Sequence, residues 1–197
     1  MRDRRNASGG DRGGRGLLVP PSAEGERPYR ITFVCTGNIC RSPMAEVITR
    51  TLAEATHLGD GSVLGDHLDV RSAGTGPWHE GEPMHPLALE ALARAGYPRH
   101  RHSARQIRSS DLGRLDLVVA LDRRHLQTLR GIGADRDRSV LLRAFDLSSG
   151  AAADVPDPYY GDDADFDDCR DMIAAGCEGL VSSLSGNWDG LWGAVPA

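Results

Sequence analysis

Residues 31–43 read ITFVCTGNICRSP, a short apolar run followed by a polar loop that ends at a proline. The first four side chains are β-branched or aromatic and predict a buried strand. The Thr-Gly-Asn segment that follows favours a tight turn. An amphipathic pattern then predicts a helix from about Pro43 to His57, with Ser42 as its cap. A strand joined to a helix by a short loop is the repeating unit of an open α/β sheet.

The same alternation of strands and helices continues along the chain. An apolar run, LDLVVAL at 115–121, has the pattern of a buried parallel strand, and Asp122 is expected to cap the helix after it. The other predicted elements are strands at Leu68–Ser72 and Ser139–Leu142 and helices at Pro86–Ala95 and Asp163–Leu184. Together these elements predict an α/β fold, a small doubly wound, four-stranded parallel sheet flanked by helices.

Length and composition restrict the class of protein. The chain has 197 residues, of which 40% are hydrophobic and 26% charged, as in one globular domain. No apolar run approaches the ~18 residues of a membrane-spanning helix, and residues 16–20 are too short for a signal-peptide core. We therefore expect a cytoplasmic protein without a membrane partner. A net charge of −5 argues against a nucleic-acid partner. All 23 basic residues are arginine, which excludes a Walker-type phosphate lysine and Schiff-base chemistry.

The two ends of the chain differ from its centre. Residues 1–28 are rich in glycine, proline and arginine and lack apolar periodicity, so we expect a disordered extension. The folded domain is expected over residues 29–184. The tail at 185–197 contains Trp188 and Trp192 among glycines, and these rings either dock on the domain or contact a partner.

The loop after the first strand has the composition of an oxyanion site. In an open α/β sheet, ligands bind where the carboxyl end of a strand meets the N-terminus of a helix. Cys35 begins the loop and Arg41 ends it, and the amides between them can surround one tetrahedral oxyanion such as inorganic phosphate. The helix dipole and the amides favour the thiolate of Cys35, and the Ser42 hydroxyl can donate to it. The residues expected to bind phosphate are Thr36, Gly37, Asn38, Ile39, Cys40, Arg41 and Ser42.

Asp157 can supply the proton that cleavage of a phosphomonoester requires. A positioned acid helps to expel an alkoxide or a phenolate. Asp157 precedes Pro158 in an irregular segment where a helix cannot continue. An aspartate in this setting is ordinarily a turn residue, and Cys35 taken alone is ordinarily a buried core thiol. The Cys-x5-Arg-Ser spacing between a strand and a helix instead favours a nucleophile, with Asp157 as its general acid.

With these motifs, the chain resembles the low-molecular-weight protein tyrosine phosphatases. The resemblance covers roughly residues 29–184 and rests on four motifs: VCTGNICRSPMAE at 34–46, SAGT at 72–75, HSARQ at 102–106 and DPYY at 157–160. It implies a flavodoxin-like fold of the phosphotyrosine phosphatase I type. It also implies hydrolysis of phosphotyrosine on tyrosine-phosphorylated proteins through a cysteinyl-phosphate. The histidines show no spacing of metal ligands, so we expect no metal and no other cofactor.

The resemblance also implies roles for residues around the loop. Tyr159 and Tyr160 would form one wall of a slot for the phosphotyrosine ring, and Trp78 would form the opposite wall. Ile39 would line the slot and contact the ring. The residues that would support the curled loop through hydrogen bonds are Asn38, Ser42, Ser72 and His102.

The four cysteines are too few for a fold stapled by disulfides. The resemblance implies that Cys40 forms a disulfide with an oxidised Cys35, as reversible protection of the nucleophile. Cys169 and Cys177 fall on one face of the last predicted helix, where core packing explains them.

Three other functions agree with parts of the pattern. Arsenate reductases share the fold and the Cys-x5-Arg loop, but they need further cysteines for a disulfide relay and the DPYY segment argues against them. Protein-arginine phosphatases resemble the family too, but they have threonine at the position of Ile39 and lack the paired tyrosines, so Ile39 with Tyr159 and Tyr160 favours phosphotyrosine. A phosphate-binding module without activity could lose the nucleophile or the acid, whereas this chain retains Cys35, Arg41 and Asp157 together.

Overall fold

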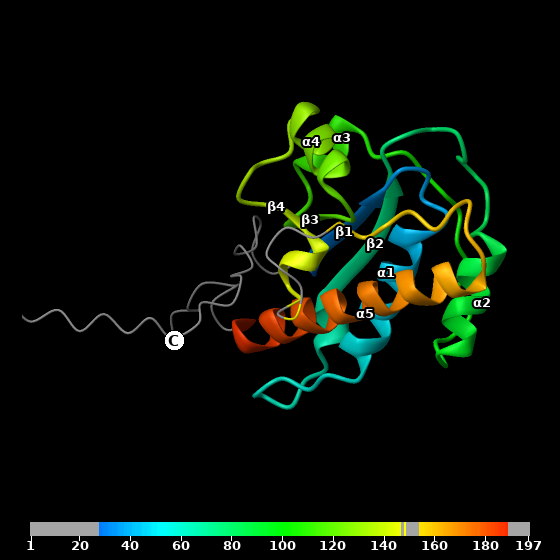
Figure 1. Ribbon diagram of the computed structural model, residues 1–197. Helices are drawn as coiled ribbons and strands as arrows, with labels where there is room; N and C mark the ends of the chain where they lie inside the picture. Colours follow the sequence, from blue (N-terminus) through cyan, green and yellow to red (C-terminus); the bar gives the residue numbers. More distant parts are fainter. Residues whose placement is uncertain (1–27, 147, 149–153, 189–197) are drawn as a thin grey trace, which may run out of the picture.

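A four-stranded parallel sheet forms the centre of the molecule (Figure 1). The computed structural model describes residues 28–146, 148 and 154–188. The strands, in the spatial order β2-β1-β3-β4, are β1 (Tyr29–Cys35), β2 (Leu68–Gly74), β3 (Leu117–Ala120) and β4 (Ser139–Leu141). The helices are α1 (Arg41–Glu54), α2 (Pro86–Arg94), α3 (Ser109–Leu112), α4 (Arg123–Gly131) and α5 (Asp163–Gly186), with short 3₁₀ turns η1 (Leu64–His67) and η2 (Leu142–Ala144). The predicted fold class is confirmed.

β1 lies in the middle of the sheet and is hydrogen-bonded to two neighbours. Phe33 pairs with Ser72 of β2 on one side and with Val119 of β3 on the other, in parallel register. All side chains of β1 except that of Arg30 are buried, as its nearly continuous apolar pattern predicts. Because the strands are parallel, their carboxyl ends meet at one edge, and the loops that follow β1, β2 and β3 gather there.

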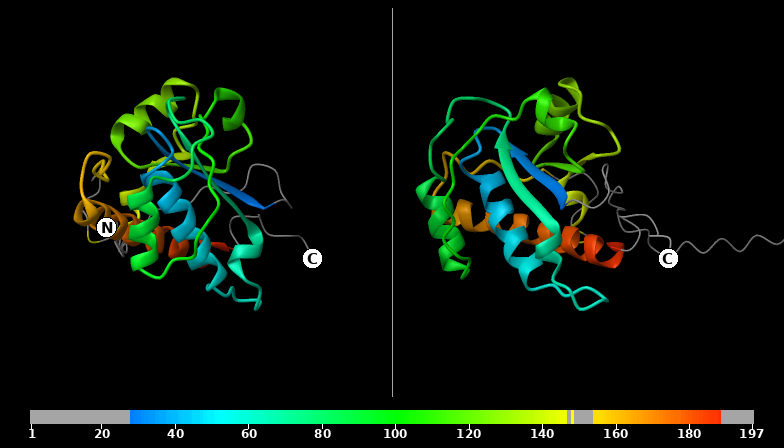
Figure 2. Two further views of the ribbon diagram at one scale, coloured as in Figure 1. Left: turned by 90° about the vertical axis from the view of Figure 1, so that its right-hand side faces the viewer. Right: turned by 180° about the vertical axis from the view of Figure 1, so that it is seen from behind.

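Helices cover both faces of the sheet (Figure 2). On one face, Phe33 belongs to the same buried cluster as Met44 of α1 and Ile173 of α5. On the other face, Val34 clusters with Leu129 of α4. Neighbouring residues of a strand point to opposite faces, so β1 contributes to both layers of the core.

The first helix begins two residues earlier than the sequence predicted. It starts at Arg41 rather than Pro43 and ends at Glu54. Ser42 is not its cap, because the residue before the helix is Cys40, which makes no capping bond through its side chain. The Ser42 hydroxyl is instead occupied by hydrogen bonds within the loop.

Other boundaries differ from prediction by a few residues. His57, predicted as the last residue of the first helix, lies beyond it and forms an isolated bridge with Val63. β3 is shorter than the LDLVVAL run, and Asp116, just before it, accepts a hydrogen bond from the N–H of Arg30 in β1. β2 and α5 continue two residues further than predicted, and α2 and β4 end one residue earlier. Asp122 caps α4 as predicted, by accepting a hydrogen bond from the N–H of His125 at 2.8 Å.

The segment after α5 contains a tryptophan that docks on the domain. Trp188 packs against the main core, and its ring centroid lies 5.2 Å from that of His67. Trp192 and all of the predicted extension except Pro28 lie outside the described residues. None of the helices in the described part of the chain is long and apolar enough to cross a membrane.

α5 approaches the segment after η2 closely at a glycine. A Cβ at Gly179 would collide with the carbonyl oxygen of Phe145, whereas a Cβ at Gly186 in the same helix would meet nothing within 4 Å. We expect Gly179→Ala to lower the free energy of unfolding by about 1–3 kcal/mol through overpacking. Gly186→Ala is the matched control and should be neutral or slightly stabilising, because alanine is the better helix former. Urea unfolding measures both variants, and equal effects would contradict the packing argument.

Candidate active site

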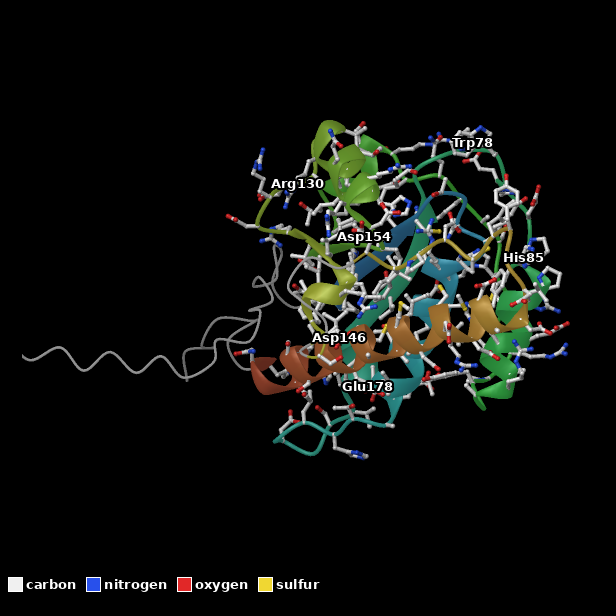
Figure 3. The ribbon with its side chains drawn as sticks, in the orientation of Figure 1. Trp78, His85, Arg130, Asp146, Asp154 and Glu178 are labelled. Carbon is white, nitrogen blue, oxygen red and sulfur yellow. The ribbon has the colours of Figure 1, made fainter. Side chains whose placement is uncertain are left out.

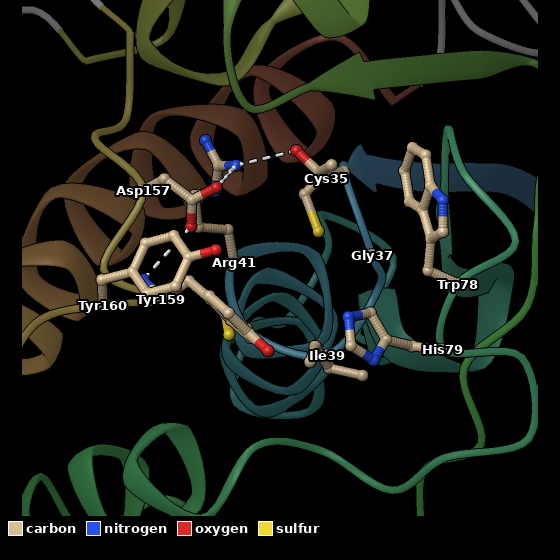
Figure 4. Close-up of a pocket in the computed structure, with 11 residues that line it drawn as sticks. Cys35, Gly37, Ile39, Arg41, Trp78, His79, Asp157, Tyr159 and Tyr160 are labelled. Carbon is tan, nitrogen blue, oxygen red and sulfur yellow. Dashed lines mark hydrogen bonds and ion pairs between the residues drawn. The ribbon is translucent and has the colours of Figure 1, made fainter.

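The loop between β1 and α1 curls beneath a cavity at the carboxyl edge of the sheet (Figure 4). The cavity has a volume of about 390 Å³, and its walls come from the segments that follow β2 and precede α5. The residues that line it are Cys35, Thr36, Gly37, Ile39, Cys40, Arg41, Trp78, His79, Asp157, Tyr159 and Tyr160. This set contains the residues that the sequence predicted to contact the substrate, except Asn38 and Ser42, which were expected to bind phosphate and do not line the cavity.

Cys35 is the last residue of β1 and lines the cavity with its sulfur directed inward (Figure 4). Its Sγ lies 3.0 Å from the Oγ of Ser42, in the first turn of α1, and only 3% of the residue is exposed. The N–H groups and the dipole at this end of a 14-residue helix favour negative charge. The position therefore suits a thiolate that is shielded from bulk water.

Asn38 holds the curl of the loop. Its φ of +59° is left-handed, the one such value among the described residues other than glycine, and asparagine tolerates this conformation well. Its Nδ2 donates to the hydroxyls of Ser42 and Ser72, at 2.9 Å each, and its Oδ1 accepts from the N–H of Arg105 at 3.0 Å. The Asn38 carbonyl accepts from Nε2 of His102 at 2.6 Å. The structure thus brings together the four residues that were predicted to support the loop.

A buried carboxylate that the sequence analysis missed lies beneath this network. Glu46, one turn after Ser42 on α1, accepts a hydrogen bond from the Ser72 hydroxyl at 2.6 Å. Its second oxygen lies 3.2 Å from Nη2 of Arg50 and 3.4 Å from Nε2 of His100. The signal that could have identified it is an acidic residue beside the apolar face of the predicted helix.

Arg41 is the first residue of α1, and its guanidinium is almost completely buried. Its Nη1 donates to Oδ2 of Asp122 at 3.0 Å and to the carbonyl of Val155 at 3.1 Å. Its Nη2 donates to Oδ2 of Asp157 at 2.5 Å and to Oγ1 of Thr36 at 3.2 Å. The sequence identified Asp122 only as a helix cap, because nothing in the chain around it indicates that its second oxygen reaches Arg41.

Asp157 comes to the cavity from a segment 116 positions after Arg41. The N–H of the neighbouring Val155 donates to the carbonyl of Leu121 at 2.9 Å, which ties this segment to the end of β3. The Asp157 side chain is 47% exposed. Its carboxyl group therefore lies between the buried guanidinium and the open mouth of the cavity, where a leaving group would depart.

Aromatic rings stand on two sides of the mouth (Figure 4). Tyr159 and Tyr160 lie edge to face with centroids 4.8 Å apart, and Trp78 stands opposite them. Trp78 is 71% exposed and projects at the outer edge of the molecule (Figure 3). His79, which the sequence analysis missed, adds a ring 6.1 Å from that of Tyr159. It covers Gly37 so closely that a Cβ there would lie 2.6 Å from its Cδ2.

Most of the sequence matches a known family. The model of the family described as "Low molecular weight phosphotyrosine protein phosphatase" matches residues 30–189. The chain belongs to this family. The family inferred from the four motifs is therefore confirmed, and with it the class of enzyme, a protein tyrosine phosphatase.

Several similar proteins carry this description. A low molecular weight protein-tyrosine-phosphatase of Streptomyces coelicolor is 47% identical over 161 residues, which cover 79% of this chain and 93% of that protein. The low molecular weight protein-tyrosine phosphatase A of Mycobacterium tuberculosis is 46% identical over 154 residues, which cover 78% of this chain and 90% of that protein.

Solved structures of the same fold give two further comparisons. YfkJ from Bacillus subtilis superposes with a TM-score of 0.71 at 34% identity, over 84% of this chain and 99% of that one. A mutant of the YwlE arginine phosphatase with a phosphorylated active-site serine superposes with a TM-score of 0.67 at 31% identity, over 79% and 95% of the two chains.

All four cysteines of the phosphatase are buried and unbridged. Burial, with a smaller contribution from Cys35, raises the pKa of the Cys40 thiol far above its usual range. Burial also raises the pKa of Cys169 to about 12. Cys169 lies closer to the site than the sequence implied, since its Sγ is 3.7 Å from the carbonyl oxygen of Pro156, the residue before Asp157. In the described part of the chain, no cluster of histidine, cysteine and acidic side chains could hold a metal ion.

Proposed function

We propose that Cys35, Arg41 and Asp157 carry out the hydrolysis of phosphotyrosine in this phosphatase. Their arrangement around one cavity carries the proposal, since a thiol beside a helix N-terminus, a buried guanidinium and a carboxyl group converge there. The backbone N–H groups of the loop, from Thr36 to Ser42, are the proposed ligands of the other phosphate oxygens.

In the first step, the Cys35 thiolate attacks phosphorus and the bond to the tyrosine oxygen breaks. Asp157 gives its proton to that oxygen, so the product leaves as a neutral phenol and the phosphate remains on sulfur. In the second step, Asp157, now a carboxylate, removes a proton from water as the water oxygen attacks phosphorus. The bond between sulfur and phosphorus breaks, and inorganic phosphate leaves. The Ser42 hydroxyl at 3.0 Å can donate to the departing thiolate.

We propose that the phosphate of the substrate replaces the Asp157 carboxylate as an acceptor of hydrogen bonds from Arg41. Asp122 and the Val155 carbonyl hold Nη1, while Nη2 donates to Asp157 and Nε is buried with no hydrogen-bond partner among the described residues. Phosphate oxygens can therefore accept from Nε and Nη2 in the bidentate manner that guanidinium favours. This exchange would release the Asp157 carboxyl group to face the leaving oxygen.

The walls of the cavity support phosphotyrosine as the substrate. A flat ring fits between the tyrosine pair and Trp78, with the buried Ile39 at the base of the slot. The proposed partners are tyrosine-phosphorylated proteins, and the cytoplasmic location stays a prediction. Protein-arginine phosphatase activity is the second candidate, because a structure named as an arginine phosphatase shares the fold.

Cys40 is proposed as the redox partner of Cys35. Its protonated thiol makes it a poor competitor for attack on phosphate, which agrees with a secondary role. If peroxide converts the Cys35 thiolate to a sulfenic acid, attack by the Cys40 sulfur would form the disulfide and release water.

Replacement of the nucleophile tests the proposed function directly. Cys35→Ser should lower kcat by about 10³-fold or more, because an alcohol beside Ser42 is a poor nucleophile. It should still bind vanadate or phosphate, since the loop amides and Arg41 remain. Arg41→Lys provides the contrast and should lose both turnover and oxyanion binding, because an ammonium cannot make the bidentate contact. Steady-state kinetics and calorimetry measure both effects, and near-normal turnover by Cys35→Ser would refute the mechanism.

Two substrates with different leaving groups test whether Asp157 is the general acid. Asp157→Asn should slow hydrolysis of phenyl phosphate by about 10²–10⁴-fold. The loss should be much smaller for p-nitrophenyl phosphate, because its weakly basic phenolate departs without a proton. Asp154→Asn is the matched control, since Asp154, labelled in Figure 3, lies outside the cavity lining. Its side chain instead accepts a hydrogen bond from the N–H of Arg123. Equal losses of Asp157→Asn with both substrates would assign the acid to another residue.

Ile39 tests the choice between the two candidate substrates. Ile39→Thr removes an apolar contact to the phenyl ring and introduces a hydroxyl that can accept from a phosphorylated guanidinium. We expect the ratio of kcat/KM for phosphoarginine over phosphotyrosine peptides to rise by about tenfold, the effect of roughly 1.4 kcal/mol. An unchanged ratio would place the selectivity in Trp78 and the paired tyrosines instead.

A further inference from the structure

The hydroxyl of Thr36 joins the catalytic arginine to a histidine from another part of the chain. Thr36 directly follows Cys35, and its Oγ1 accepts a hydrogen bond from Nη2 of Arg41 at 3.2 Å. The same oxygen lies 2.9 Å from Nε2 of His125, on α4 and 89 positions away. His125 is 4% exposed and does not line the cavity. It therefore has no direct access to a substrate.

The proton positions in this chain of contacts follow from the chemistry of the groups. A guanidinium can only donate, so the Thr36 oxygen must offer a lone pair to Arg41. The single proton of the hydroxyl is then free to point at His125, provided that Nε2 is unprotonated and can accept. A neutral imidazole with its proton on Nδ1 meets this condition.

The surroundings of His125 favour that neutral form. Nδ1 lies 3.1 Å from Oδ1 of Asp122, and although the two atoms are not aligned as a hydrogen bond, a carboxylate there favours a proton on Nδ1. Burial lowers the pKa of His125 to about 4. The charged groups around it are Asp122, Arg41, Asp157 and Asp154, and the carboxylates only partly offset the effect of burial.

We propose that His125 is a positioning residue for Arg41, which acts by accepting the Thr36 hydroxyl proton and so keeping a lone pair of that oxygen turned toward the guanidinium. The inference rests on the role of Arg41 in the proposed function. Asp122 and Val155 fix Nη1, whereas Nη2, the nitrogen expected to meet the phosphate, depends on Thr36 and Asp157. Without His125, the hydroxyl could rotate its proton toward Arg41 and the guanidinium would lose a fixed acceptor.

Two substitutions of similar size separate positioning from packing. His125→Leu removes the acceptor, while His125→Gln retains an amide oxygen that can reach Thr36. We expect His125→Leu to lower kcat about 3- to 10-fold and to weaken vanadate inhibition by a similar factor, the effect of one lost hydrogen bond. KM should change less, because Arg41 binds the transition state more strongly than the ground state. His125→Gln should recover kcat and vanadate affinity to within about twofold.

Thr36→Val tests whether the effect passes through the hydroxyl. In that background His125→Leu should cause no further loss of kcat or vanadate affinity, because the shared contact is already absent. Kinetics normalised to titrated active sites, with thermal unfolding of each variant, exclude a simple loss of folded enzyme. Additive losses, equal impairment of the leucine and glutamine variants, or wild-type kinetics of His125→Leu would each overturn the inference. Retained turnover by Cys35→Ser would instead refute the proposed function, so the two failures are distinguishable.

Discussion

The backbone from Cys35 to Arg41 must close into a tight curl, and the rest of the site depends on this closure. Such a curl turns backbone N–H groups inward, away from helix or sheet partners, so side chains must hold it from outside. Asn38 does so by adopting a left-handed conformation and bonding to α1, to β2 and to the segment before α3. The network is buried, and a missing member would leave unpaired polar groups that cost more than the lost bond contributed. The loop is therefore held in one shape before any phosphate binds.

Arg41 supports the structure through Nη1 and Nη2, and in the proposed mechanism it binds phosphate through Nη2 and Nε. A buried guanidinium needs acceptors for its N–H groups, and here they come from Thr36, Asp122, Val155 and Asp157, on three separate loops. These loops meet because parallel strands end at one edge of the sheet. The acceptors fix the plane of the guanidinium, so residues outside the cavity influence how it meets a substrate. The residues that position the guanidinium therefore include some that do not line the cavity.

In the proposed function, the residues that carry out the chemistry and those that select the substrate lie at different depths of the cavity. Cys35, the proposed nucleophile, and Arg41 are buried, while Trp78 and Tyr160 are largely exposed at the mouth. A protein of the same fold, the YwlE arginine phosphatase, is 31% identical to this chain. In this chain Ile39 lies at the base of the slot and is buried, unlike the residues of the rim. The depth of each residue explains why a motif predicts the reaction more securely than the substrate.

The sequence by itself was sufficient to predict the fold class, the family and the position of the loop between the first strand and the first helix, because these features depend on local signals: apolar periodicity, a glycine-asparagine turn, and cysteine and arginine at a fixed spacing. It placed the first helix two residues late and took Ser42 for its cap, because the hydroxyl's bonds to Cys35 and Asn38 become visible only when the loop is closed. The roles of Glu46, Asp122 and His125 could be decided only by the tertiary structure. Each makes its decisive contact with a segment at least 26 positions away, and such contacts arise from the packing of strands and helices rather than from any local pattern.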